Sequence, residues 1–264
     1  MGNPRVSVVQ YLNTVPLVWG MLHGEGRGKF ELDFTTPACC ADAVRSGAAD
    51  VGIIPSIEYQ RLEDAEIVGG VSIASKGRVR SVLLLSKVPI EHVRSVALDN
   101  SSRTSVALLA ILLRKFYGRE VESIPFAPQP DAMLERADAA LVIGDPALAY
   151  QGQVAAVYDL AEEWKKFTGL PFVFALWAGN ADAKLARFAK DFESSRDYGL
   201  AHVDEIAEEY GPKCALDPQT AKVYLTQNID YTLDEENRRG LVLFYQLAHE
   251  MGLIPAAKEL KFAS

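Results

Sequence analysis

The sequence has few of the features that commit a protein to a membrane, to disulfide bonds or to export. Its three cysteines are the adjacent Cys39 and Cys40 and the distant Cys214, a spacing that fits neither a disulfide framework nor a metal site. No apolar run reaches the roughly 18 residues of a transmembrane helix. The first residues lead directly into a strand-like segment, without the pattern of a signal peptide. We therefore expect reduced cysteines, a cytoplasmic location and no contact with a membrane.

Positive charge is also scarce, and so are the motifs of nucleotide and metal chemistry. The formal net charge is −8, which argues against a nucleic-acid surface and means that an anionic ligand needs a local binding site. There is no P-loop, no GxGxxG, no HExxH and no nucleophile elbow. The histidines lie away from the strand ends discussed below and from metal-binding partners: His23, His92, His202 and His249. We expect no cofactor and no metal, and the sequence leaves the oligomeric state open.

What the sequence does contain is an alternation of short apolar strands and helical segments. Hydrophobic residues make up 49% of the 264 positions, enough for a large core. The pattern runs as two strand–helix series and then becomes helical to the end. Two crossings between the series, near residues 82–86 and 174–178, predict an α/β protein of two lobes. We place residues 1–88 and 178–264 in the first lobe and residues 89–177 in the second.

The most informative stretch is a polar segment between an expected strand and an expected helix. Residues 95–98 form a short apolar strand, and the apolar residues from Val106 onward have helical spacing. The backbone N–H groups of a helix N-terminus carry partial positive charge, so hydroxyls and a guanidinium there suit a carboxylate or a phosphate. We expect an anion-binding site formed by Ser102, Arg103, Thr104 and Ser105. An ordinary helix cap beside an unused arginine is the alternative.

Polar residues also stand at the ends of other expected strands. Ligands of open parallel sheets bind at the carboxyl ends of the strands. The expected strands run over residues 5–10, 51–54, 79–86 and 139–143. We expect further binding residues beside them at Tyr11, Asn13, Thr14, Ser56, Ser81, Gly144 and Asp145.

Some of these positions have a plainer structural explanation. Asn13 and Thr14 are also good turn formers. Asp145 can cap the helix that Pro146 begins, and capping is its commoner role. The sequence alone therefore leaves both roles open at these positions.

The candidate residues come from both lobes, so we expect them to face each other across a cleft. That layout is typical of a periplasmic binding protein, which closes around its ligand by a hinge motion. Burial between the lobes removes water, so each hydrogen bond from a hydroxyl or an N–H group counts for more. The expected fold class is a two-lobed α/β protein of the type II periplasmic-binding-protein kind.

Four segments carry a family resemblance in this order along nearly the whole chain. They are Tyr11-Leu12-Asn13-Thr14, residues 50–59, Ser102-Arg103-Thr104-Ser105 and Ile143-Gly144-Asp145. Together they resemble the chorismate dehydratase family of the futalosine route to menaquinone. The resemblance implies a periplasmic-binding-type fold without transport. It also implies a hydro-lyase that converts the chorismate dianion to 3-[(1-carboxyvinyl)oxy]benzoate and water.

The implied reaction suits such a site, because losing a hydroxyl and a ring proton makes an aromatic ring. The enzyme must chiefly orient the substrate and ease one proton transfer. Donors held against the ring carboxylate, from residues 103–105 or from Ser56, would stabilise the charge that develops there. No histidine, lysine or glutamate stands where a general base is expected. We expect the substrate's own enolpyruvyl carboxylate to take the proton, with Asn13 as the catalytic residue that orients it or the departing hydroxyl.

Three other functions fit parts of this pattern. A dihydroxynaphthoate synthase of the same pathway is also two-lobed, but a histidine is expected there near Gly144 and Asp145, and none is present. A solute-binding protein for a small carboxylate would have the same fold and is expected to begin with a signal peptide or a lipoprotein cysteine. A ligand-sensing domain would need a DNA-binding module, for which the chain leaves no room.

Overall fold

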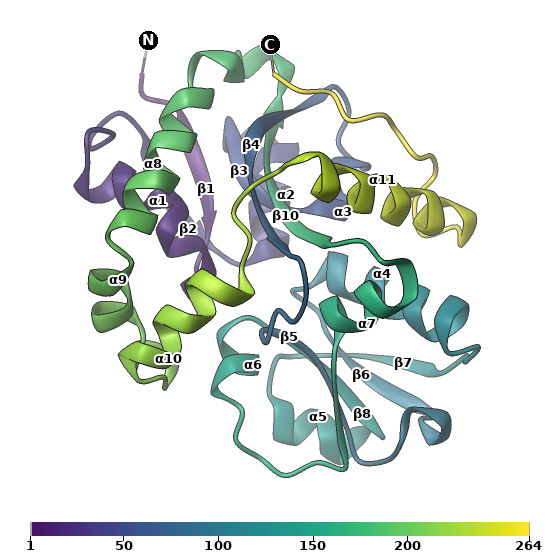
Figure 1. Ribbon diagram of the computed structural model, residues 1–264. Coiled ribbons are helices and arrows are strands. Elements are labelled where there is room, and N and C mark those ends of the chain that lie inside the picture. The colour runs from purple at the N-terminus through teal and green to yellow at the C-terminus, as the bar shows by residue number, and fades with distance from the viewer. Residues whose placement is uncertain (1, 264) are drawn as a thin grey trace.

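Two five-stranded sheets form the centre of the protein (Figure 1). The computed structural model describes residues 2–263. The first sheet has the order β2 (Glu31–Thr35), β1 (Arg5–Val9), β3 (Val51–Pro55), β10 (Phe172–Asn180) and β4 (Ala65–Ser75). The second has the order β7 (Glu122–Phe126), β6 (Ser95–Asp99), β8 (Ala139–Ile143), β5 (Val82–Ser86) and β9 (Ala156–Asp159). We call the parts built on these sheets the first and the second lobe.

Both sheets are parallel at one side and antiparallel at the other. In the first, β1 is parallel to β2 and β3, whereas β10 lies antiparallel between β3 and β4. In the second, β6 is parallel to β7 and β8, whereas β5 is antiparallel to β8 and β9. β3 and β8 are apolar and buried along their whole length, as expected of central strands covered on both faces. The last residues of β1, β3 and β8, which are Val9, Pro55 and Ile143, line a cavity between the lobes.

The helices pack around the two sheets. They are α1 (Val15–His23), α2 (Pro37–Arg45), α3 (Ser56–Tyr59), α4 (Arg103–Ile111), α5 (Pro130–Arg136), α6 (Asp145–Ala149), α7 (Leu160–Thr168), α8 (Ala189–Ala201), α9 (Val203–Tyr210), α10 (Pro218–Val223) and α11 (Glu235–Glu250). α4 continues as a π-helical turn over Leu112–Phe116, and α10 as one over Tyr224–Asn228. Among the residues that the structure describes, no helix is long and apolar enough to cross a bilayer.

The helices after β10 contact both lobes (Figure 1). α8 packs along α1, and α9 packs against α10. The turn between α9 and α10, Pro212–Cys214, contacts α6 of the second lobe, and α11 contacts both β10 and α4. The C-terminal part of the chain therefore touches the second lobe at two separate places.

Sheet membership places the crossings between the lobes elsewhere than the sequence analysis did. The expected boundaries after residues 88 and 177 assign β5 to the first lobe and β10 largely to the second. The structure pairs β5 with β8 and β9, and β10 with β3 and β4. An apolar strand fits either sheet equally well, so its pattern does not reveal which sheet it joins. The chain crosses at residues 76–81 and 169–171.

The expected strand over residues 79–86 begins only at Val82. Arg80 has a φ of 64°, a left-handed conformation that residues other than glycine rarely adopt. The N–H groups of Val79 and Arg80 donate to the carboxylate of Asp159 at 3.1 and 2.7 Å. These bonds hold the first crossing in a sharp turn immediately before Ser81.

Helices α1 and α8 approach each other closely through two glycines. A Cβ atom on Gly20 would lie 2.6 Å from the Cα atom of Ser195, and one on Gly199 would lie 2.7 Å from the Cα atom of Pro16. Both distances are well below van der Waals contact. α1 begins directly after residues 12–14, so this helix pair fixes the position of the polar turn at the end of β1.

We expect Gly199→Ala to lower the free energy of unfolding by about 1–3 kcal/mol. Alanine is the better helix former by about 1 kcal/mol, but the overlap with the Pro16 backbone outweighs that gain. Gly69→Ala is a matched control, because the nearest atom to its new Cβ atom lies 3.7 Å away. Urea denaturation of both variants measures the difference. Equal stability would contradict the close packing of α1 and α8.

Candidate active site

A cavity lies between the lobes, where the carboxyl ends of strands from both sheets meet. Its volume is about 70 Å³, below the range of about 300–1,000 Å³ for small-molecule sites, so this arrangement of the lobes is closed tightly around it. Its polar lining consists of Tyr11, Asn13, Ser81, Ser102, Arg103, Thr104 and Ser105. Gly144 and apolar side chains such as Val9, Ile73 and Phe174 complete the wall.

The structure thus brings most of the expected site residues together, but three of them lie outside this lining. Ser56 is fully buried behind the wall. Thr14 and Asp145 line a second cavity of about 460 Å³ beside the first. Tyr11 lines both cavities.

The N-terminus of α4 forms one wall of the main cavity. Ser102 is the N-cap residue, and its side chain makes no capping bond. The first N–H groups of a helix have no partner within the helix. Thr104 Oγ1 accepts a hydrogen bond from the N–H group of Ile57 in the first lobe at 3.2 Å. The start of α4 therefore offers hydroxyls and N–H donors to an anion in the cavity while also contacting the opposite lobe.

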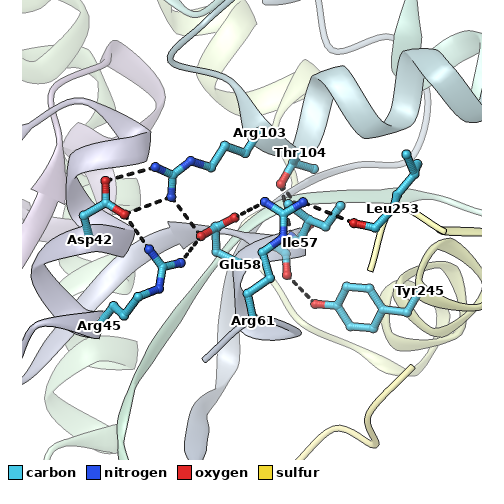
Figure 2. Close-up of polar contacts among 10 residues, drawn as sticks. Asp42, Arg45, Ile57, Glu58, Arg61, Arg103, Thr104, Tyr245 and Leu253 are labelled. Atoms are coloured by element: carbon cyan, nitrogen blue, oxygen red, sulfur yellow. Dashed lines mark hydrogen bonds and ion pairs between the residues drawn. The ribbon is translucent and has the colours of Figure 1, made fainter. Parts of the chain in front are cut away.

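Arg103 reaches across the cleft to two carboxylates (Figure 2). Its Nη1 donates to Asp42 at 3.0 Å and to Glu58 at 2.9 Å, and its Nη2 donates to Asp42 at 2.9 Å. The hydrogen bonds with Asp42 raise the pKa of Arg103 and lower the pKa of Asp42. Binding of a ligand carboxylate by Arg103 stays a prediction, because both of its terminal nitrogens already bind carboxylates of the first lobe.

Glu58 is a fully buried carboxylate with three arginine partners (Figure 2). Arg61 donates to its Oε1 at 2.6 Å, while Arg45 and Arg103 both donate to its Oε2. Arg61 also donates to the carbonyl of Leu253, close to the end of α11. A buried carboxylate is tolerated only when it is paired. Glu58 therefore ties α2, α3 and α4 together around one charge.

Ser56 serves the packing of the lobes. Its Oγ donates to the carbonyl of Val173 on β10 at 2.8 Å and lies 3.5 Å from Thr104 Oγ1. Its own carbonyl accepts a hydrogen bond from the Tyr245 hydroxyl at 2.6 Å. Pro55, the residue before it, is the one that lines the cavity. The ligand-binding role expected of Ser56 stays a prediction.

Asn13 lies on a 3₁₀ turn over Leu12–Thr14, directly after β1. Its side chain is 9% exposed and lines the main cavity. Thr14 Oγ1 donates to Asn13 Oδ1 at 3.3 Å. This bond orients the amide and leaves its nitrogen free to donate elsewhere.

Tyr11 and Gly144 meet where the two lobes touch. Gly144 has a φ of 65°, and a Cβ atom there would lie 2.7 Å from the Tyr11 ring, so the position requires glycine. The N–H group of Gly144 donates to the carbonyl of Ser81 at 2.7 Å. Burial raises the pKa of Tyr11 to about 12. Its hydroxyl therefore stays protonated near neutral pH and serves as a donor.

Asp145 does not cap the helix that follows it. Gly144 is the N-cap residue of α6, whereas Asp145 Oδ1 accepts a hydrogen bond from the N–H group of Leu12 in the first lobe at 3.0 Å. Burial raises the pKa of Asp145, although the bonds from Leu12 and from the Cys214 thiol oppose the shift. Asp145 thus joins the lobes at the edge of the second cavity.

The main cavity is poor in groups that exchange protons. Its described lining residues include no histidine, lysine, aspartate or glutamate. Within residues 2–263, no three histidine, cysteine, aspartate or glutamate side chains gather as a metal site. In the first lobe, the His23 ring lies tilted against Trp19, and the ring of His202, between α8 and α9, stacks on Tyr198.

Sequence comparison assigns this chain to a family. Residues 4–250 match the family described as Menaquinone biosynthesis. The chain belongs to this family. A chorismate dehydratase of Thermus thermophilus is 32% identical to it, with 96% of this chain and 95% of that protein aligned. A chorismate dehydratase of Campylobacter jejuni is 27% identical over 77% of each chain.

Solved structures place this member of the menaquinone biosynthesis family among periplasmic-binding-protein folds. An Archaeoglobus fulgidus protein has a TM-score of 0.78 at 20% identity, covering 96% of this chain and 98% of that one. The periplasmic aliphatic sulphonate binding protein SsuA of Escherichia coli has a TM-score of 0.69 at 16% identity, covering 97% and 95%. The expected two-lobed fold is confirmed, and these likenesses concern the fold alone.

Three polar residues of this site were missed in the sequence analysis. Asp42 and Glu58 pair with Arg103, and Tyr224 donates to Ser81 Oγ at 2.9 Å. The partners in the last bond are 143 residues apart. Asp42 and Glu58 each have an arginine three residues on, Arg45 and Arg61, which is a local sign of an ion pair. Their pairing with Arg103 and the contact between Tyr224 and Ser81 join distant parts of the chain, so no local pattern reveals them.

We expect Arg103→Ala to shift the ligand-free protein about tenfold toward an open arrangement of the lobes, because a charge-assisted contact across the cleft is lost. Arg45→Ala is the matched control, since Arg45 binds the same two carboxylates but lies in the same lobe. Small-angle scattering at low salt should give a larger radius of gyration for Arg103→Ala only. Equal radii for the two variants would contradict a role of Arg103 in closure.

The raised pKa of Asp145 predicts a pH-dependent effect of Asp145→Asn. The folded protein holds this proton more tightly than the unfolded chain, so wild type loses stability relative to Asp145→Asn as the pH rises above about 4. Asp138→Asn is an opposite control, because N–H donors, chiefly that of Arg94, lower the pKa of Asp138. At Asp138, the extra stability of wild type over Asp138→Asn disappears as the pH falls through the lowered pKa. Thermal melts across pH 3–8 test both slopes, and a pH-independent difference for Asp145→Asn would contradict the burial argument.

Proposed function

We propose that this protein is a chorismate dehydratase, which converts chorismate to 3-[(1-carboxyvinyl)oxy]benzoate and water in the futalosine route to menaquinone. The observation that carries the proposal is the 32% identity with the Thermus thermophilus enzyme over nearly the full length of both proteins. Membership of the menaquinone biosynthesis family supports it. The free thiols of Cys39, Cys40 and Cys214 fit a cytoplasmic location.

The substrate is a dianion with two carboxylates, so the site must supply donors without relying on the net charge of the protein. The start of α4 meets this need with the hydroxyls of Ser102 and Ser105 and the N–H groups of the first turn. We assign one carboxylate of chorismate to this wall. Donors there stabilise negative charge that spreads onto the carboxylate when the ring loses its proton.

The proton itself needs an acceptor, and the cavity wall offers none of the usual bases. Tyr11 is a protonated donor, and Arg103 is a permanent cation. The nearest suitable base is the enolpyruvyl carboxylate of the substrate. In this scheme the carboxylate takes the ring proton and passes it to the departing ring hydroxyl, which leaves as water. The electron pair of the broken C–H bond completes the aromatic ring.

Asn13 is the side chain best suited to orient these groups. It stands in the lobe opposite α4 and can donate and accept hydrogen bonds at once. Thr14 fixes its carbonyl oxygen, so its amide nitrogen faces a consistent direction. We propose that this group holds the departing hydroxyl or the enolpyruvyl carboxylate in the geometry of elimination.

Purified protein should convert chorismate to the substituted benzoate, followed by mass spectrometry and by ultraviolet absorbance. We expect Asn13→Ala to lose at least about a hundredfold in kcat while it binds the product within about tenfold of wild type, the pattern of an interaction made in the transition state. Asn180→Ala is the control, because its amide only donates to the carbonyl of Val44 away from the cavity.

Thermal melting of both variants separates chemistry from folding. An Asn13→Ala protein that keeps the wild-type kcat would exclude the orienting role. Wild type that binds chorismate without consuming it would instead indicate a solute-binding protein and overturn the proposed activity.

A further inference from the structure

Ser81 is held in place from its backbone side by several strong constraints. The preceding residue, Arg80, has a φ of 64°, a conformation that persists only where the surroundings enforce it. Asp159 enforces it by accepting hydrogen bonds from the N–H groups of Val79 and Arg80. On the other side, the Ser81 carbonyl accepts from Gly144 at 2.7 Å. Such strain concentrates at functional positions.

The Ser81 side chain is held as well, by a residue that does not line the cavity. The hydroxyl of Tyr224 donates to Ser81 Oγ at 2.9 Å. Tyr224 is 1% exposed and lies on the π-helical turn that continues α10, a type of irregularity frequent at functional sites. Burial raises the pKa of Tyr224, so its hydroxyl stays protonated and remains a donor.

The same tyrosine also meets the second polar group of the cavity. Burial raises the pKa of Tyr224, and the Asn13 side chain is among the neighbours that oppose this shift. Asn13 comes from the end of β1, and Ser81 from the crossing between the lobes. Tyr224 therefore lies behind both of these cavity-lining groups, and it holds Ser81 directly.

We infer that Tyr224 is a positioning residue, which directs the Ser81 hydroxyl proton toward the substrate. A serine hydroxyl has one proton and can also accept. Because Tyr224 supplies the proton of their shared bond, the proton of Ser81 is available to an acceptor in the cavity. Ser81 then donates to an oxygen of the bound substrate, beside Asn13, which Thr14 orients. Without Tyr224, the Ser81 hydroxyl can rotate and turn its proton away from the substrate.

The inference rests on the proposed function and is tested with Tyr224→Phe, which keeps the ring and removes the hydroxyl. We expect kcat to fall about ten- to a hundredfold with KM within about threefold, because misplaced groups affect the transition state more than binding. Tyr231→Phe is the matched control. Tyr231 is a neighbouring buried tyrosine whose hydroxyl has no hydrogen-bond partner among the described residues. It should keep the kcat of wild type.

A double-mutant cycle shows whether Tyr224 acts through Ser81. In a protein that already carries Ser81→Ala, Tyr224→Phe should cause less than about half of the loss in kcat that it causes in wild type. The reason is that the side chain positioned by Tyr224 is already gone. If Tyr224→Phe lowers kcat by the same factor with and without Ser81→Ala, the inference is overturned. An unchanged kcat in Tyr224→Phe, measured beside an active wild-type protein, would also overturn the inference. That result would leave the proposed function intact. An inactive wild-type protein would overturn both.

A measurement on wild type alone guards against a variant that does not fold. In a crystal structure with the product bound, Ser81 Oγ should lie about 3 Å from both the Tyr224 hydroxyl and a product oxygen. A complex in which Ser81 has left Tyr224, or in which it contacts no product atom, would overturn the inference.

Discussion

The closed arrangement of the two lobes depends on the burial of one charge, the carboxylate of Glu58. With a side-chain exposure of 0%, Glu58 must be paired within the protein. Two of its partners, Arg45 and Arg61, come from the first lobe, but the third, Arg103, comes from the second. Arg103 also begins α4, whose N-terminus forms a wall of the cavity. The pairing of Glu58 therefore sets the distance between that wall and the strand ends opposite.

The architecture could be predicted from the sequence because it follows from periodic patterns. Short buried strands such as β3 and β8 alternate with helices, and polar residues follow their carboxyl ends, so the two lobes and the cleft were predictable. The cavity duly brings together Asn13, Ser81 and the residues at the start of α4. These positions were found because each is marked by its own neighbours in the chain.

Other features were beyond the reach of the sequence, because they arise from pairs that meet only in the folded protein. Arg103 was assigned to a ligand anion, yet Asp42 and Glu58 compete for it from the opposite lobe. Asp145 has the sequence of a helix cap, yet it accepts from Leu12 across the cleft. In both cases the sequence predicted the chemistry at the strand end, a donor at Arg103 and an acceptor at Asp145. It did not predict which group each of them binds.

The way in which the site is built also bears on the reaction. An elimination that ends in an aromatic ring needs orientation more than a strong base, and the wall of this cavity supplies hydroxyls, an amide and helix N–H groups. Such groups are effective only if their directions are fixed, because a hydroxyl or an amide that rotates cannot tell one substrate oxygen from another. Here buried residues behind the wall fix them: Thr14 holds Asn13, and Asp159 holds the turn before Ser81. The precision of the site therefore depends on buried residues behind the wall as well as on those that line it.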